Sequence, residues 1–214
     1  MKVLVVGANG GTGRHILRML GGSNDHQAVA MIRDITQSAE LEKLGISETV
    51  LADLEDEVEH AVEGCDAILF AAGSGSKTGP EKTITVDQEG AIKLVQAAEK
   101  HGVKRFVMLS TVGADNPEYG SEGMKHYFEA KKKADDALRE SSLTYTIVRP
   151  GRLSYDAGTG KIRAAAQLDD YSGDISREDV AKVMIESLNV ENTKGKTFEF
   201  LSGDTNIVEA LKSL

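Results

Sequence analysis

The sequence predicts an α/β protein with a doubly wound parallel sheet covered by helices on both faces, a three-layer α/β/α arrangement. Apolar runs of three to six residues recur along the chain, and segments with helical periodicity separate them. A glycine-rich turn joins the first run to the first helical segment. Continuous apolar runs need cover on both faces, which crossover helices provide in parallel sheets. This alternation predicts right-handed crossovers and a ligand site at the carboxyl ends of the strands.

Apolar runs predict six buried strands before residue 150. In chain order they are residues 3–6, 28–32, 49–51, 67–70, 106–109 and 144–148. One helical stripe from Asp87 to Ala98 separates the fourth strand from the fifth, and another from Tyr127 to Leu138 separates the fifth from the sixth. The first six strands therefore account for most of the sheet.

The chain changes texture after Pro150. Residues 151–173 are rich in Gly, Asp and Ser and lack a long apolar period, which predicts an irregular excursion that lines a pocket. Ser176, with Asp179 three residues later, predicts the N-cap of a late helix. A last strand over 197–201 and a short helix from about Thr205 complete the expected order.

Length and composition limit the classes of protein that fit. At 214 residues we expect one domain over 1–214, with a small pocket-forming region around 151–175. The net charge of −9 disfavours nucleic acid and anionic membrane surfaces as partners. Cys65 is the only cysteine, and no apolar stretch approaches the roughly 20 residues of a membrane span. We therefore expect a cytoplasmic protein, monomeric or homodimeric, without a secretion signal or membrane anchor.

The glycine-rich turn at the end of the first strand predicts a dinucleotide site. Gly7 permits the tight turn, Gly10 lets the backbone approach a diphosphate, and Gly13 allows the helix to pack closely on the strand. The helix start then offers free N–H groups to the anion. The predicted phosphate-binding residues are Gly7, Asn9, Gly10, Gly11, Thr12, Gly13 and Arg14. With this turn, the expected fold is of the Rossmann type.

Arg33 favours NADP over NAD as the cofactor. It stands where the second strand should end, and with Arg14 it offers two guanidinium groups to a 2′-phosphate. Two alternatives remain open: Arg33 can be a surface charge, and Asp34 can accept from the ribose 2′-hydroxyl of NAD.

Three further motifs follow the third, fourth and sixth predicted strands, so the motifs together span nearly the whole chain. Asp53-Leu54 follows the third strand, Ala71-Ala72-Gly73 the fourth, and Arg149-Pro150-Gly151 the sixth. These segments resemble the short-chain dehydrogenase/reductase superfamily, in particular its small atypical NAD(P)-binding members, which include NmrA-like and biliverdin reductase B-like oxidoreductases and NAD-dependent epimerase/dehydratases. The resemblance implies that Asp53 and Leu54 meet the adenine edge, that Ala71, Ala72 and Gly73 pass the ribose, and that Pro150 and Gly151 close over the nicotinamide. Asp53 as a helix cap is the alternative.

The same resemblance supplies catalytic candidates, Ser110, Tyr127 and Lys131. Tyr127 and Lys131 are four residues apart on a helix and so share a face. The ammonium should lower the pKa of the phenol and hold the nicotinamide ribose, while Ser110 binds the substrate carbonyl. The alternative for Tyr127 is core packing beside an exposed lysine.

Asp87 departs from the pattern of many active relatives. Those relatives carry an asparagine on this helix, whereas Asp87 lies on the inward stripe and must be hydrogen-bonded or protonated there. The usual proton relay is therefore in question. No group of His, Cys and carboxylate residues has metal-ligand spacing, so we expect no metal.

The expected function is that of an NADP-dependent oxidoreductase acting on a small carbonyl, quinone or flavin-like substrate. A sugar epimerase or dehydratase uses the same hydride chemistry, although relatives that hold nucleotide-sugars resemble longer chains. A third possibility is a redox sensor that binds NADP without turnover, which the departure at Asp87 motivates.

Overall fold

The protein is described by a computed structural model covering residues 1–75, 78–119 and 121–214. The strands of its main sheet are β1 (Lys2–Val6), β2 (Gln27–Ile32), β3 (Glu48–Leu51), β4 (Ala67–Phe70), β5 (Arg105–Leu109), β6 (Thr144–Pro150), β8 (Lys161–Ala165), β10 (Lys196–Ser202) and β11 (Thr205–Asn206). A separate pair of parallel strands consists of β7 (Arg152–Ser154) and β9 (Asp174–Ser176).

The helices follow the same alternation. They are α1 (Gly11–Gly21), η1 (Ile35–Gln37), α2 (Ser38–Glu42), α3 (Glu59–Val62), α4 (Pro80–Lys82), η2 (Thr83–Gly90), α5 (Ala91–Lys100), η3 (Pro117–Tyr119), α6 (Lys125–Glu140), α7 (Arg177–Glu186), η4 (Glu191–Thr193) and α8 (Ile207–Lys212).

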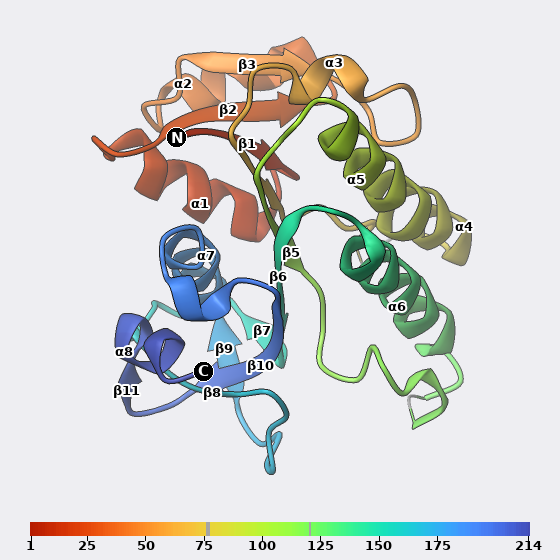
Figure 1. Cartoon of the computed structure of the whole chain (residues 1–214), viewed down its shortest axis with the longest axis vertical. Coiled ribbons are helices and arrows are strands. Elements are labelled where there is room, and N and C mark those ends of the chain that lie inside the picture. The colour runs from red at the N-terminus through yellow and green to blue at the C-terminus, as the bar shows by residue number, and fades with distance from the viewer. Residues whose placement is uncertain (76–77, 120) are drawn as a thin grey trace.

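Strand order confirms the predicted doubly wound, Rossmann-type sheet. Within the described residues the order is β11-β8-β10-β6-β5-β4-β1-β2-β3, and every pair from β10 to β3 is parallel (Figure 1). The strand order reverses between β1 and β4, which is where such sheets bind ligands. Beyond β10 the sheet ends in β8 and β11, paired antiparallel.

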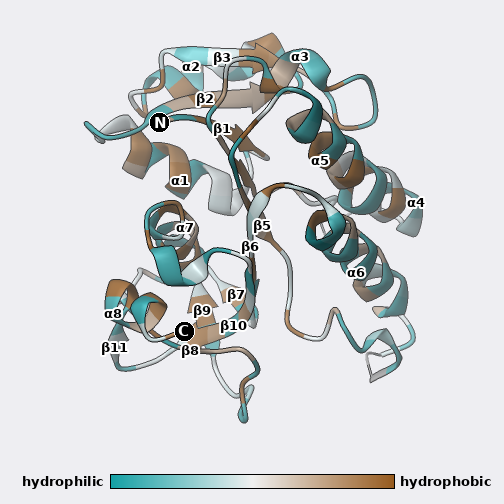
Figure 2. Ribbon diagram, in the orientation of Figure 1, coloured by the Kyte–Doolittle hydropathy of each residue, from teal (hydrophilic) through white to brown (hydrophobic). Residues whose placement is uncertain are grey.

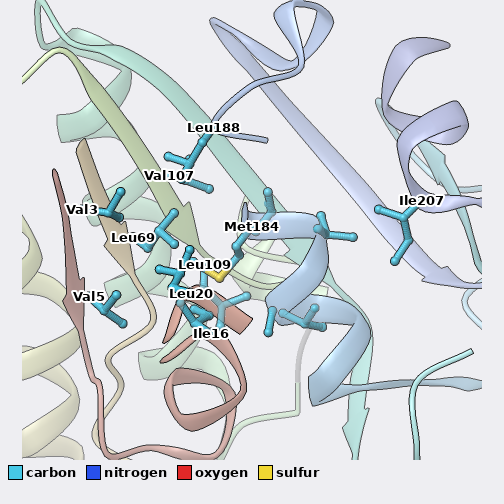
Figure 3. Packing of buried hydrophobic residues seen from close by; sticks show 14 of the residues in the cluster. Val3, Val5, Ile16, Leu20, Leu69, Val107, Leu109, Met184, Leu188 and Ile207 are labelled. Atoms are coloured by element: carbon cyan, nitrogen blue, oxygen red, sulfur yellow. The ribbon is translucent and has the colours of Figure 1, made fainter. Parts of the chain in front are cut away.

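Two hydrophobic layers cover the sheet and confirm the three-layer arrangement. Alternate residues of β1 face opposite sides. Val3 and Val5 pack into one cluster with residues of α1 and α7, and Figure 3 shows Ile16, Leu20 and Met184 of these helices against the strands. The other face of β1 packs into a second cluster with α3, α5 and α6. Figure 2 shows hydrophobic and hydrophilic bands alternating along α5 and α6, as one-sided burial requires.

Residues 151–173 contain regular structure that the sequence does not predict. β7 has three residues and β8 half-buries its side chains, so neither produces a recognisable apolar run. The late helix α7 begins as predicted, because the Ser176 hydroxyl accepts from the Asp179 N–H at 3.0 Å. β10 and α8 match the last strand and helix.

The helix that carries Asp87 begins with a π-helical segment, η2, that continues directly into α5. Asp87 is 1% exposed, and the stripe that continues through Ala91, Leu94 and Ala98 is buried as predicted. In α6 the buried stripe also includes two charged residues, Lys131 and Asp135. A sequence stripe judged on hydrophobicity alone excludes such residues, because a buried charge requires a partner from elsewhere in the fold.

Candidate cofactor and catalytic site

Packing requires two of the three glycines of the phosphate turn. Gly7 has φ +79°, and a Cβ there would lie 2.6 Å from Ala72 Cα. A Cβ at Gly13 would overlap the carbonyl oxygen of Gly7, where α1 crosses the end of β1. A Cβ at Gly10 would meet only that same oxygen, at 3.1 Å. Gly10 is therefore the glycine whose missing side chain leaves space at the groove, and its role toward a diphosphate stays a prediction.

A groove of about 320 Å³ lies over the switch point at the carboxyl ends of the strands. The predicted cofactor residues that line it are Gly7, Asn9, Gly10, Arg33, Asp53, Leu54, Ala71, Ala72 and Gly73. Gln37 and Lys82 also line it, and no sequence signal singled them out. A wider hollow of about 650 Å³ lies at the other end of the strands, around Met1, Asp25 and Asp66. The smaller groove is the candidate site, since it adjoins the phosphate turn.

The two arginines expected at a 2′-phosphate have different partners. Arg33 is exposed and lines the groove. Arg14 is outside the residues that line it: its Nη1 donates to Asn9 Oδ1 at 2.7 Å, and its Nη2 lies 3.8 Å from Glu40 Oε2. Arg14 thus holds the turn in place. Asp34 accepts from the Thr36 N–H and hydroxyl, and these bonds lower the pKa of its carboxyl.

Asp53 lines the groove and caps none of the described helices. Its Oδ1 accepts from the Glu55 N–H at 3.0 Å within a turn, and the next helix, α3, begins only at Glu59. Gly11, Thr12 and Gly13 form the first turn of α1, and of these Gly11 is exposed.

Lys131 lies buried beneath Tyr127 with a charged partner from η2. Its Nζ lies 3.0 Å from Asp87 Oδ1 and 5.8 Å from the centre of the Tyr127 ring. The second oxygen of Asp87 accepts from the Ser74 N–H at 2.9 Å. Burial lowers the pKa of Lys131, but the charge and close approach of Asp87, together with the charges of Tyr127 and Asp135, outweigh burial and raise it. Lys131 is therefore a cation, as the sequence predicted; Asp87 Oδ1 lies beside its ammonium but accepts no hydrogen bond from the described residues.

The pKa of Tyr127 differs from the expected direction. Burial raises it, and the charge of Asp87 adds to that effect. Lys131 lowers it as expected but does not compensate, so the net pKa lies above its ordinary value of 10.0. The phenol is therefore protonated at neutral pH.

The hydroxyl of Ser110, which was expected to bind the substrate carbonyl, has a partner within the protein. This hydroxyl is buried and donates to Asp135 Oδ2 at 2.8 Å. The next residue, Thr111, is half-buried; its hydroxyl donates to the Val112 carbonyl at 3.2 Å, and its side chain lowers the pKa of Tyr127. Consecutive side chains at a strand end point to opposite sides. Ser110 thus supports α6 from beneath, and Thr111 is the hydroxyl beside Tyr127.

A buried ion network continues from Ser110. Arg149 donates from Nη2 to Asp135 Oδ2 at 2.7 Å and binds both carboxylate oxygens of Asp115. Burial raises the pKa of Asp135 although Arg149 opposes it, and the bonds from Arg149 lower the pKa of Asp115 to about 2. Arg149 therefore joins β6, α6 and the segment after β5.

The turn after Arg149 packs tightly rather than opening into the groove. Pro150 is buried, and a Cβ at Gly151 would lie 2.5 Å from Leu201 Cδ2. Neither residue lines the groove, so their predicted place over the nicotinamide stays a prediction. In the described part of the chain, no three His, Cys, Asp or Glu residues gather as metal ligands would. Likewise, no described helix combines the length and hydropathy of a membrane span.

The Rossmann-type sheet, the glycine turn and the groove at the switch point define a dinucleotide-binding protein. The chain belongs to the NAD(P)H-binding family, whose sequence profile matches residues 7–191.

Relatives of the chain carry names from two enzyme classes. It is 48% identical to an uncharacterized sugar epimerase of Bacillus subtilis, with 100% of each chain covered. It is also 48% identical to a solved structure from Bacillus halodurans provisionally named an NAD-dependent epimerase/dehydratase, with a TM-score of 0.96 and 100% of both chains covered. An oxidoreductase structure from Lactococcus lactis is 34% identical, with a TM-score of 0.87 over 100% of this chain and 96% of that one.

Proposed function

We propose that the protein is an NADP-dependent oxidoreductase of the atypical short-chain dehydrogenase/reductase type, which reduces a small carbonyl, quinone or flavin-like acceptor. The observation that carries this proposal is the group formed by Tyr127, Lys131 and Thr111 beyond the phosphate turn. The oxidoreductase name of the Lactococcus lactis relative supports the same class. The bound nicotinamide supplies the hydride.

The residues of this chain supply the proton and orient the acceptor. The raised pKa keeps Tyr127 protonated, so its phenol donates to the oxygen that gains charge as the acceptor is reduced. The Thr111 hydroxyl donates to the Val112 carbonyl in this structure; by rotating, it would donate to the same oxygen of the acceptor and take the role first expected of Ser110. Lys131 stabilises the phenolate left after donation, because its ammonium stays charged beside Asp87.

Preference for NADP rests on Arg33. Its exposed guanidinium lines the groove and is suited to a 2′-phosphate, whereas the Asp34 carboxylate already accepts from Thr36. We expect NADPH to bind at least several-fold more tightly than NADH, and Arg33→Ala to remove that difference. Arg18→Ala, an exposed arginine on α1, is the matched control. An unchanged ratio in Arg33→Ala would overturn the NADP assignment.

Tyr127→Phe separates an enzyme from a redox sensor. The variant should bind NADPH as the wild type does and lose NADPH oxidation with a panel of carbonyl, quinone and flavin acceptors. Thr111→Val should reduce kcat more than Ser110→Ala does, provided that both variants keep their fold. If none of the acceptors in the panel leads the wild type to oxidise NADPH, a redox sensor is favoured. Conversion of a nucleotide-sugar without net loss of NADPH would instead favour an epimerase, the class named among its relatives.

A further inference from the structure

The phosphate turn has a neighbour that its sequence motif does not include. Arg177, the first residue of α7, lies against Gly11, the first residue of α1. A Cβ built on Gly11 would lie 2.8 Å from Cδ and 3.0 Å from Nε of Arg177. The φ of Gly11 is not positive, so glycine is needed here for the space it leaves and not for its backbone conformation. The space that it leaves is filled by the arginine.

Two contacts fix the direction of this guanidinium. Its Cζ lies 3.9 Å from the centre of the Tyr155 ring, and its Nη1 donates to the Ser154 carbonyl at 2.9 Å. The register of β7 and β9 pairs Ser154 with Ser176, so Tyr155 and Arg177 leave adjacent strand ends together. An arginine stacked on an aromatic ring keeps its in-plane N–H groups available.

The charge of Arg177 is not matched by a carboxylate. Among residues 1–75, 78–119 and 121–214, no Asp or Glu oxygen lies within 4.0 Å of it, whereas Arg149 and Arg152 have such partners. The Nε and Nη2 groups likewise have no hydrogen-bond acceptor in that part of the chain. A half-buried, pre-oriented cation therefore remains beside the phosphate turn.

We propose that Arg177 binds the diphosphate of the dinucleotide, with Tyr155 as its positioning residue. The groove reaches the turn from the side of Gly7 to Gly10, and Arg177 reaches it from the side of Gly11. A diphosphate that crosses the turn lies between them, and a guanidinium fork matches its oxygens. The proposal rests on cofactor binding by this family and does not depend on turnover.

Calorimetry with the purified full chain tests the proposal through binding alone. The probes are NADPH, 2′-phospho-ADP-ribose, which keeps the diphosphate but lacks nicotinamide, and adenosine 2′-monophosphate, which lacks the diphosphate. Arg177→Ala should weaken binding of the first two by roughly 10- to 100-fold, as loss of a charge-assisted bond predicts, and leave the third unchanged. Arg152→Ala is the matched control, because Arg152 lies on β7, which pairs with the strand that precedes Arg177, and binds Asp174.

Further variants identify how Arg177 acts. Tyr155→Leu should cost a smaller factor, about two- to fivefold, and Tyr155→Phe should restore wild-type binding. Gly11→Ala alone should displace Arg177 and weaken NADPH binding. In an Arg177→Ala background the same change should weaken binding little further, because the atoms that its Cβ meets within 3.4 Å belong to Arg177.

Unchanged NADPH affinity in Arg177→Ala would overturn the proposal, and a simultaneous rise in acceptor KM would assign the residue to the substrate instead. An equal loss for adenosine 2′-monophosphate would overturn it too. Failure of turnover in the wild type, by contrast, would affect only the proposed reaction.

Discussion

Asp87→Asn removes one charge of the ion pair that holds Lys131 beneath Tyr127. The two atoms lie 3.0 Å apart, and the side chains are 5% and 1% exposed. At an effective dielectric constant of about 20, this separation corresponds to an attraction of about 5.5 kcal/mol. Asparagine has the same shape but only one oxygen. If that oxygen keeps the Ser74 N–H, the amide N–H₂ faces the ammonium.

The expected loss in the free energy of unfolding is about 3–5 kcal/mol, because Lys131 is left buried without a counter-charge. Such a loss is a large fraction of the roughly 5–15 kcal/mol of a natural domain. Lys132 provides the control, since it pairs with Asp136 at 2.8 Å and both side chains are about 40% exposed. Asp136 also accepts from Arg139 at 2.8 Å, and with both partly exposed pairs lost Asp136→Asn should cost about 1 kcal/mol or less.

Urea unfolding followed by circular dichroism at neutral pH measures both variants. Repeating it at high salt adds a second comparison, because salt screens the exposed pair and hardly affects the buried one. A loss below about 1 kcal/mol for Asp87→Asn, or equal losses for both variants, would refute the conclusion that Asp87 and Lys131 form a buried charged pair.

Three further predictions concern the turn, the phenol and the ion network. Gly10→Ala should retain stability within about 1 kcal/mol and lose cofactor affinity, whereas Gly13→Ala should lose about 2–3 kcal/mol, since its Cβ overlaps a carbonyl oxygen; thermal melts and NADPH titrations distinguish the two, and equal melting temperatures would contradict the packing argument. If Tyr127 donates the proton, reduction should show no loss between pH 7 and about 9, because the raised pKa keeps the phenol protonated below it, and a fall centred below pH 9 would exclude that role. Asp115 has a pKa lowered to about 2 by Arg149, so its stabilisation is present above its ordinary 3.8 and disappears as the pH falls toward 2; Asp115→Asn should lack that part of the acid sensitivity in pH-dependent unfolding, and identical acid profiles would contradict it.

The sequence predicts the sheet well because its central strands are buried on both faces. Every residue of β4 and all but the first of β1 are apolar, so both strands stand out in the sequence as apolar runs. β7 and β9 have three residues each and pair only with one another, so no periodic pattern can reveal them. The glycine turn was predictable because Gly7 and Gly13 have local steric causes and Gly10 has a fixed place between them in the motif.

The candidate site was less predictable because partners come from distant segments. The sequence placed Tyr127 and Lys131 on one helix face, but the direction of the phenol pKa depends on burial and on Asp87, 40 residues earlier. Whether Ser110 or Thr111 faces Tyr127 depends on the residue at which β5 ends, which the sequence does not define. Arg177 had no motif, and only the packing of α7 against α1 brings it to the turn.

The π-helical turn at residues 83–90 makes the length of this helix part of the site. A π turn contains one residue more than an α turn, and each residue of an α-helix advances about 100° around the axis. Deleting one of residues 88–90 would let the segment relax into a regular helix, but everything before the deletion, Asp87 included, would rotate relative to α5. Asp87 would then lose its position toward Lys131 even though no site residue had been changed. An insertion or deletion in this segment is therefore expected to disrupt the site as much as a substitution in the groove does.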